Sequence, residues 1–116
     1  MKKYNLEYTM VKLEIFIPVT HLEQMGEALR RAGAGAMGHY DSTLSYSLVR
    51  GRWRPLPGAN PYDGEAGRLC ERDEYKIETI CQAEILDDVL REIRAAHPYE
   101  SPAINAIPLI KTGLDL

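Results

Sequence analysis

Hydrophobic positions along the chain follow two different periods. Residues 11–17 and 70–81 carry apolar side chains at alternate positions, as strands with one buried face do. Residues 22–32 and 83–96 repeat apolar residues every three or four positions, which is typical of amphipathic helices. A weaker alternation over residues 40–54 and a short apolar run over residues 103–110 predict two further strands. The predicted order is strand, helix, strand, strand, helix, strand.

Local signals predict where the helices begin and end. Thr20 followed by Glu23 has the capping-box spacing, so we expect Thr20 to cap the first helix. Gly33 suits the left-handed residue that follows a helix, and Pro98 stops the second helix. Three prolines and three glycines within residues 55–67 exclude regular structure there. A loop of this length in a compact domain usually has a function or is held by a neighbour.

This order of elements predicts a ferredoxin-like βαββαβ sandwich of the α+β class. Two strand–helix–strand halves would share one antiparallel sheet and place both helices on the same face. The 116 residues suit a single domain. Residues 1–10 are polar and have no period, so we expect an N-terminal extension followed by one domain over residues 11–116.

Net charge, the N-terminal sequence and the cysteine content exclude several classes of protein. The net charge is −3 and the sequence pI is about 5.6, which disfavours a dedicated nucleic-acid binder. Glu7 and Glu14 interrupt the apolar residues near the N-terminus, and no stretch reaches the ~20 apolar residues of a membrane span. We therefore expect a soluble, cytoplasmic protein without a membrane or nucleic-acid partner. Cys70 and Cys81 form neither a metal knuckle nor a disulfide framework, and we expect both to be small buried side chains.

Several short motifs occur in a fixed order along the chain. Together they resemble the YqfO/Nif-three-like family, and more narrowly the inserted domain of that family, over residues 11–108. The motifs are GAGAMGHY at 33–40, RPLPGANP at 54–61, GEAG at 64–67, YKIET at 75–79 and AHPYE at 96–100.

This resemblance implies a fold and an assembly. In the full-length family members the insert is similar to CutA and PII proteins and caps a separate core with a two-metal site. The His, Asp and Glu ligands of that core have no counterpart here, where the histidines are His21, His39 and His97. Residues 97–102 also resemble the HPYE-x-P segment of CutA itself. The resemblance therefore implies a stand-alone CutA/PII-like domain that forms a homotrimer, without the part to which hydrolase-like activity is attached.

A candidate metal site lies at the end of the second helix. His97 and Glu100 offer an imidazole and a carboxylate, which copper and zinc accept, and the similarity to CutA supports a divalent metal. Two ligands do not complete a site, so His39 or another subunit would have to supply more. The alternative is a helix-to-strand corner in which Pro98 sets the turn while Tyr99 and Glu100 hydrogen-bond to the backbone.

A candidate ligand site lies at the long loop. Arginines alternate along residues 50–54, with Trp53 on the opposite face, and their guanidinium groups suit phosphate or carboxylate. PII proteins carry their ligand-responsive loop at this place. The alternative is that the arginines pair with neighbouring acids such as Glu71, Asp73 and Glu74. The predicted ligand-binding residues are Arg52, Arg54, Asn60, Glu78 and Tyr99.

The glycines of residues 33–38 formally match the dinucleotide pattern GxGxxG. That pattern works where a strand leads into a helix N-terminus, which then meets the pyrophosphate. Here the glycines follow a helix and precede a strand. We therefore interpret them as a tight helix-to-strand turn.

The preferred function is a small trimeric binding protein that holds a metal ion or a small anionic ligand in clefts between subunits. A second hypothesis is a protein-interaction module derived from the cap domain, in which Trp53 and Tyr62 contact a partner protein. A third is an enzyme whose metal site is completed across the trimer. No nucleophile arrangement is recognisable, which favours a protein that is not an enzyme.

Overall fold

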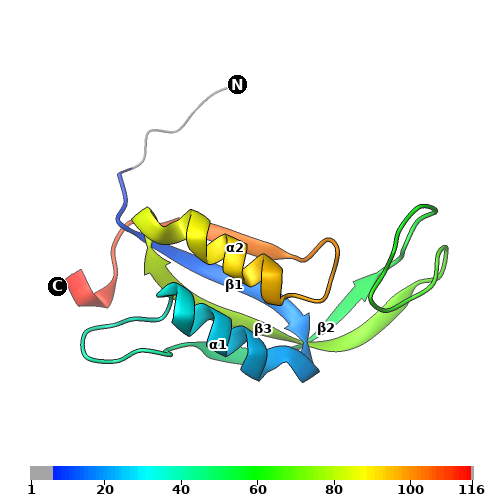
Figure 1. The fold of residues 1–116 in the computed structure, drawn as a ribbon, viewed down its shortest axis with the longest axis horizontal. Helices are drawn as coiled ribbons and strands as arrows, with labels where there is room; N and C mark the ends of the chain where they lie inside the picture. Colours follow the sequence, from blue (N-terminus) through cyan, green and yellow to red (C-terminus); the bar gives the residue numbers. More distant parts are fainter. Residues whose placement is uncertain (1–6, 116) are drawn as a thin grey trace.

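Residues 7–115, which the computed structural model describes, form a four-stranded antiparallel sheet with two α-helices on one face (Figure 1). The strand order is β2-β3-β1-β4. This is the predicted ferredoxin-like sandwich. None of the helices in these residues is long and apolar enough to cross a membrane. The elements are β1 (Met10–Pro18), α1 (Leu22–Ala32), β2 (Ser45–Trp53), β3 (Cys70–Gln82), α2 (Leu86–Ala96) and β4 (Ile104–Leu109).

The hydrophobic core lies between β1 and the two helices. Alternate residues of β1 face the helix layer, and Leu13, Ile15 and Ile17 are fully buried there. They pack with Met25 of α1 and Val89 of α2. Since β1 pairs with β3 on one side and β4 on the other, its pattern of alternating burial is the clearest in the chain. The period-two signal of the sequence therefore predicted this strand correctly, and β1 is one of the two interior strands of the sheet.

The first helix begins differently from the capping-box prediction. Thr20 lies in a 3₁₀ turn (Val19–His21), where its hydroxyl oxygen is 2.8 Å from the Nδ1 atom of His21. His21 is the residue that precedes α1, and no side chain caps the helix. The prediction was wrong because the 3₁₀ turn already bends the chain into the helix. At the other end Gly33 is left-handed, with φ of 96°, as predicted.

The glycine-rich segment is a tight connection, as interpreted from the sequence. The N–H of Gly35 donates to the carbonyl of Ile80 at 2.8 Å, which brings the segment onto β3. A Cβ atom at Gly35 would lie 2.5 Å from the carbonyl oxygen of Thr43. The segment 33–44 therefore needs glycine for close packing. It also shortens the predicted strand, because regular pairing with β3 begins only at Ser45.

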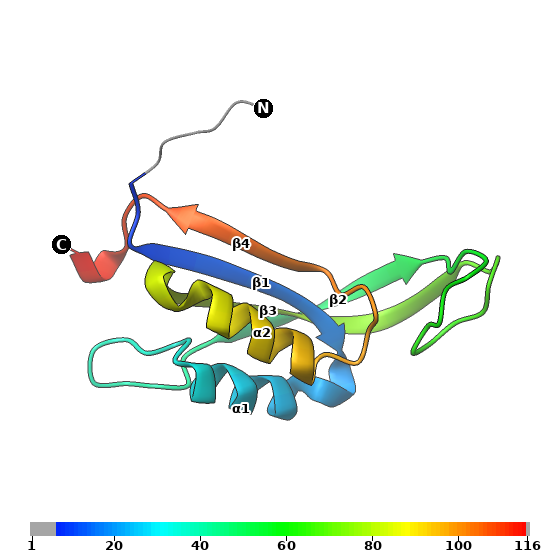
Figure 2. The same ribbon diagram turned by 45° about the horizontal axis from the view of Figure 1, so that its top comes forward.

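Strands β2 and β3 continue beyond the rest of the sheet as a two-stranded arm that carries the loop 54–69 (Figure 2). Exposed ion pairs line the arm, with Arg50 2.9 Å from Asp73 and Arg52 2.9 Å from Glu71. The loop has no regular structure, as its prolines and glycines predicted. The arm brings this loop next to the connection between α2 and β4, and the candidate site lies at that junction.

The two cysteines lie at opposite ends of the third strand. Cys70 begins β3 and Cys81 is one residue from its end. Both are buried and neither forms a disulfide. They are small buried side chains, as predicted.

Candidate ligand-binding pocket

A pocket of about 400 Å³ lies where the arm meets the segment 97–103 between α2 and β4. Its volume falls in the range usual for sites that hold small organic molecules. Residues from four separate parts of the chain form its walls, so the pocket exists only in the folded protein. The side chains that matter most below are Phe16, Trp53, Tyr62, Glu74, Tyr99 and Glu100.

Aromatic rings make up much of the pocket wall. The ring centroids of Trp53 and Tyr99 are 5.6 Å apart, and those of Tyr62 and Tyr99 are 6.0 Å apart. The indole N–H of Trp53 donates to the carbonyl of Asp63 at 3.0 Å, which fixes the orientation of the ring. The wall is therefore ordered without a ligand, and it offers flat surfaces on which another ring could stack.

A buried carboxylate lies among these rings. Glu74 is only 5% exposed, and its Oε2 atom accepts a hydrogen bond from the hydroxyl of Tyr99 at 2.7 Å. Burial and the neighbouring Glu74 carboxylate raise the pKa of Tyr99, so the hydroxyl keeps its proton and acts as the donor. The Oε1 atom lies against Gly51, where an added Cβ would come within 2.0 Å of it. The missing side chain of Gly51 therefore makes room for this carboxylate.

His97 anchors the segment that carries Tyr99. The Nε2 atom of His97 is 2.7 Å from the carbonyl oxygen of Phe16, and its Nδ1 atom accepts the N–H of Tyr99 at 3.2 Å. The first contact requires a proton on Nε2, which assigns the tautomer. Burial lowers the pKa of His97 and favours this neutral form. Both ring nitrogens are thus engaged in holding the corner between α2 and β4.

Glu100 joins the two loops at the mouth of the pocket. Its Oε1 atom accepts the backbone N–H of Asn60 at 2.9 Å, across forty residues of sequence. Together with His97, this matches the alternative interpretation of the HPYE motif as a corner stabilised by backbone hydrogen bonds. The Glu100 part of that alternative is found in the structure, whereas the hydroxyl of Tyr99 bonds to the side chain of Glu74 and not to the backbone.

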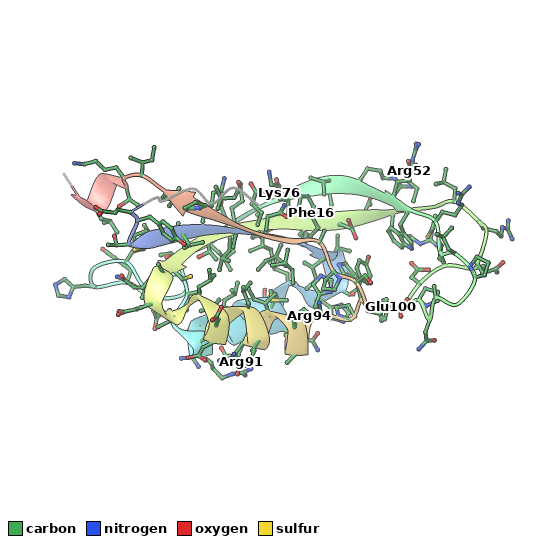
Figure 3. All side chains as sticks on the ribbon, turned by 90° about the horizontal axis from the view of Figure 1, so that it is seen from above. Phe16, Arg52, Lys76, Arg91, Arg94 and Glu100 are labelled. Carbon is green, nitrogen blue, oxygen red and sulfur yellow. The ribbon has the colours of Figure 1, made fainter. Side chains whose placement is uncertain are left out.

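The structure brings several of the predicted ligand-binding residues together. Arg52, Arg54 and Tyr99 all line the pocket, and Asn60 adjoins it through its bond to Glu100. The Arg52 side chain, however, points away from Glu100 and pairs with Glu71 (Figure 3). The alternative in which arm arginines pair with nearby acids therefore holds for Arg50 and Arg52. Arg54 has no ion pair or hydrogen bond with any residue of the described range 7–115.

Glu78, also predicted to bind a ligand, lies outside this pocket. It sits directly opposite Glu14 across the β1–β3 pair, so the two carboxylates meet on one sheet face, as the sequence allowed. The ammonium of Lys12 is 2.7 Å from Glu78, and this hydrogen bond lowers the pKa of the carboxyl group. Lys76 lies on the same face, away from the helices (Figure 3). The positive charges of Lys12 and Lys76 therefore offset the negative charges of Glu14 and Glu78.

The three predicted metal ligands are not gathered within one chain. His39 is exposed in the segment 33–44, and this segment lies at the opposite end of the helix layer from the segment 97–103 that carries His97 and Glu100 (Figure 1). Across residues 7–115, no group of three or more His, Cys, Asp and Glu side chains is arranged to hold a metal ion. A copper or zinc site stays a prediction that depends on a second subunit.

Two residues of the pocket were missed or misassigned in the sequence. Glu74 was considered as a partner for the arginines, but it bonds to Tyr99 instead. Gly51 was not singled out, although a glycine inside a strand often marks a close approach. A glycine next to Arg52, inside an otherwise regular strand, could therefore have indicated that another side chain packs against the backbone at this position.

Comparisons with known proteins identify relatives over most of this chain, although no family model matches it. A protein of Halalkalibacterium halodurans named GTP cyclohydrolase 1 type 2 homolog is 40% identical over 105 residues, which cover 90% of this chain and 28% of the relative. The solved structure of a Bacillus cereus protein related to NIF3 is 34% identical, with a TM-score of 0.78 over 92% of this chain and 27% of that one. The chain thus spans little more than a quarter of these relatives.

Solved CutA structures share the fold over nearly their full length. CutA1 of Shewanella sp. SIB1 matches with a TM-score of 0.68, covering 92% of this chain and 87% of that protein, at 15% identity. At that identity the likeness concerns the fold alone. This chain is therefore homologous to one segment of the NIF3-related (YqfO) proteins, and it shares its fold with CutA.

Proposed function

We propose that this chain is a small homotrimeric binding module that holds a small anionic organic molecule in the pocket beside its arm, at a cleft between subunits. The observation that carries the proposal is the combination of ordered aromatic walls with Arg54, whose guanidinium has no partner within residues 7–115. An arginine among the lining residues of a largely apolar pocket is suited to bind phosphate or carboxylate.

The trimer is supported by the likeness to CutA and by the edge of the sheet. Strand β2 is an edge strand, and its Tyr46 and Leu48 are 52% and 64% exposed. An edge with exposed apolar side chains is usually covered by another chain. Light scattering during size exclusion tests this directly, because three copies of 13.1 kDa make a particle of about 39 kDa. A stable monomer would contradict the assembly.

The names of the relatives supply the first ligands to try. GTP appears in the name of the curated homologues, and inorganic phosphate and ATP test for general anion binding. Titration calorimetry with the wild type is compared with Arg54→Ala and with Arg68→Ala. Arg68 is an exposed arginine of the same loop that lies outside the pocket. We expect Arg54→Ala to weaken anion binding about tenfold or more and Arg68→Ala to leave it unchanged. Equal effects of both variants, or no binding by any anion, would refute the proposal.

A divalent metal is the alternative ligand. Copper or zinc would have to use His97, Glu100 or His39 together with groups from another subunit, and His97 already uses both ring nitrogens. Metal analysis of the untreated protein, followed by titration with Cu²⁺ and Zn²⁺, decides between the two ligands. Stoichiometric metal that is lost in His97→Gln would favour the metal.

A second candidate function is a protein-interaction module. The arm loop exposes Leu56, Tyr62 and Leu69 at 55–62% of their surface. Apolar residues clustered on a protruding loop are typical of contacts with another protein. The relatives contain about three quarters of their length outside the matching segment, so a protein that resembles this remainder is the candidate partner. A pull-down with the wild type and with Leu56→Ser/Leu69→Ser tests it, and capture that is equal for both would contradict this function.

A further inference from the structure

The carboxylate of Glu74 is unusual among the charged groups of the pocket. It is 5% exposed, and no cation within residues 7–115 forms an ion pair with it. The hydroxyl of Tyr99 donates a hydrogen bond to its Oε2 atom. No fully buried side-chain oxygen in residues 7–115 lacks a hydrogen-bond partner, so the other oxygen of Glu74 is reachable from the pocket that this residue lines.

The other charged groups that line the pocket are mostly engaged elsewhere. Once these pairs are set aside, Glu74 and Arg54 are the charged lining residues that remain available to a ligand. The engaged groups are Arg52 with Glu71 (2.9 Å), Asp63 with Arg72 (2.8 Å) and Glu100 with the N–H of Asn60 (2.9 Å).

Resting on the proposed function, we propose that the ligand is amphoteric rather than purely anionic. Its N–H donors would bond to Glu74, its anionic group would bond to Arg54, and its flat ring would pack against the wall that Trp53 forms with the tyrosines. A ligand with anionic groups alone would place negative charge beside Glu74 and be disfavoured there. A buried acceptor, in contrast, discriminates strongly for a ligand that carries the matching donor.

Gly51 supports this assignment. A Cβ at this position would come within 2.0 Å of Oε1 and 2.5 Å of the carboxyl carbon of Glu74. Any other residue would push the carboxylate out of its place. The strand thus has no side chain at the point where the Glu74 carboxylate packs against it. A glycine at such a position commonly makes room for a binding group that must be held in place.

Two kinds of molecule share the required chemistry. Guanine nucleotides combine a flat base, adjacent N–H donors and a phosphate. Aromatic amino acids combine a flat ring, an ammonium group and a carboxylate. Each has a close analogue that lacks the N–H pattern: AMP for GMP, and indole-3-propionate for L-tryptophan. Titration calorimetry with these two pairs separates the two sources and tests the role of the donor.

We expect the wild type to bind GMP or L-tryptophan about tenfold or more tighter than its analogue, the range usual for a hydrogen bond to a charged group. Glu74→Gln should remove most of that difference. Its amide oxygen can still accept the Tyr99 hydroxyl, so the fold is retained, and thermal melting checks this. Glu78→Gln, on the same strand but outside the pocket and paired with no pocket residue, is the matched control and should keep the difference.

The inference is overturned, with the proposed function intact, if AMP and indole-3-propionate bind as tightly as their partners. It is also overturned if the preference survives in Glu74→Gln, or if only simple anions bind. Failure of every ligand in both panels would refute the proposed function as well. Should Glu74→Gln not fold, the two ligand pairs on the wild type alone still decide the question.

Discussion

The Nε2 atom of His97 lies 2.7 Å from the carbonyl oxygen of Phe16, a residue eighty-one positions earlier in the chain. This bond joins the end of α2 to the end of β1. The same imidazole accepts the N–H of Tyr99 through Nδ1. One neutral histidine therefore holds together the strand, the helix and the segment that supplies a wall of the pocket.

Stability should depend on pH through His97. Burial lowers its pKa below the ordinary value of 6.5, so the unfolded chain binds this proton more readily than the folded chain. The stabilising contribution is complete above 6.5 and is lost as the pH falls below 6.5 through the folded pKa. Urea denaturation at intervals from pH 8 to pH 5 measures the effect, with a falling midpoint expected below 6.5.

The variant His97→Gln identifies the source of that slope. Glutamine can donate to the Phe16 carbonyl but does not titrate in this range. We expect a lower stability at pH 8 and a flatter profile between pH 7 and pH 5 than in the wild type. An unchanged slope would assign the effect to other groups.

Gly51→Ala and Gly26→Ala should change stability in opposite directions. At Gly51 the added Cβ collides with Glu74, so we expect a loss of about 1–3 kcal/mol. At Gly26, inside α1, the added Cβ would lie 3.9 Å from Leu44, an ordinary contact. Alanine there should stabilise the helix by about 0.5–1 kcal/mol. Thermal and urea melts of both variants check the pair, and equal shifts would contradict the packing described at Glu74.

Tyr99→Phe removes the hydroxyl that donates to Glu74 and leaves a buried carboxylate without this partner. We expect the free energy of unfolding to fall by about 1–3 kcal/mol. Tyr40→Phe, at a residue that is 74% exposed, serves as the control and should change it by less than about 0.5 kcal/mol. A double-mutant cycle with Glu74→Ala, which removes the acceptor, measures the coupling between the two side chains. Additive effects would mean that the bond contributes nothing.

Glu100→Ala should loosen the arm loop without unfolding the domain. It removes the acceptor for the N–H of Asn60 at an exposed position, so the global stability should change by less than about 1 kcal/mol. Local opening should make the loop a better protease substrate. Trypsin cleavage after Arg68, which precedes Leu69, is therefore expected to accelerate relative to the wild type and to the exposed-site control Glu84→Ala. Equal cleavage rates in the three proteins would show that this bond does not restrain the loop.

Some parts of the fold followed from local patterns and others did not. The alternation in β1 and the helical spacing of residues 22–32 were sufficient, because burial of one face imposes a period that the chain displays directly. Gly33 also behaved as its residue type requires. The prediction that Thr20 caps the first helix was wrong, because Thr20 lies in a 3₁₀ turn that leads directly into the helix. Boundaries depend on such competition between neighbouring hydrogen bonds.

The amino-acid sequence by itself determined the order of strands and helices, the irregular loop 55–67 and the likeness to one segment of the NIF3-related proteins. Only the tertiary structure decided that Glu74 meets Tyr99 beside Gly51, and that Arg52 pairs with Glu71 while Arg54 lacks such a partner within residues 7–115. The physical reason is the distance along the chain over which the interacting residues are separated. Secondary structure follows from the period of nearby residues, whereas the pocket joins side chains whose proximity depends on how the arm and the segment 97–103 pack together.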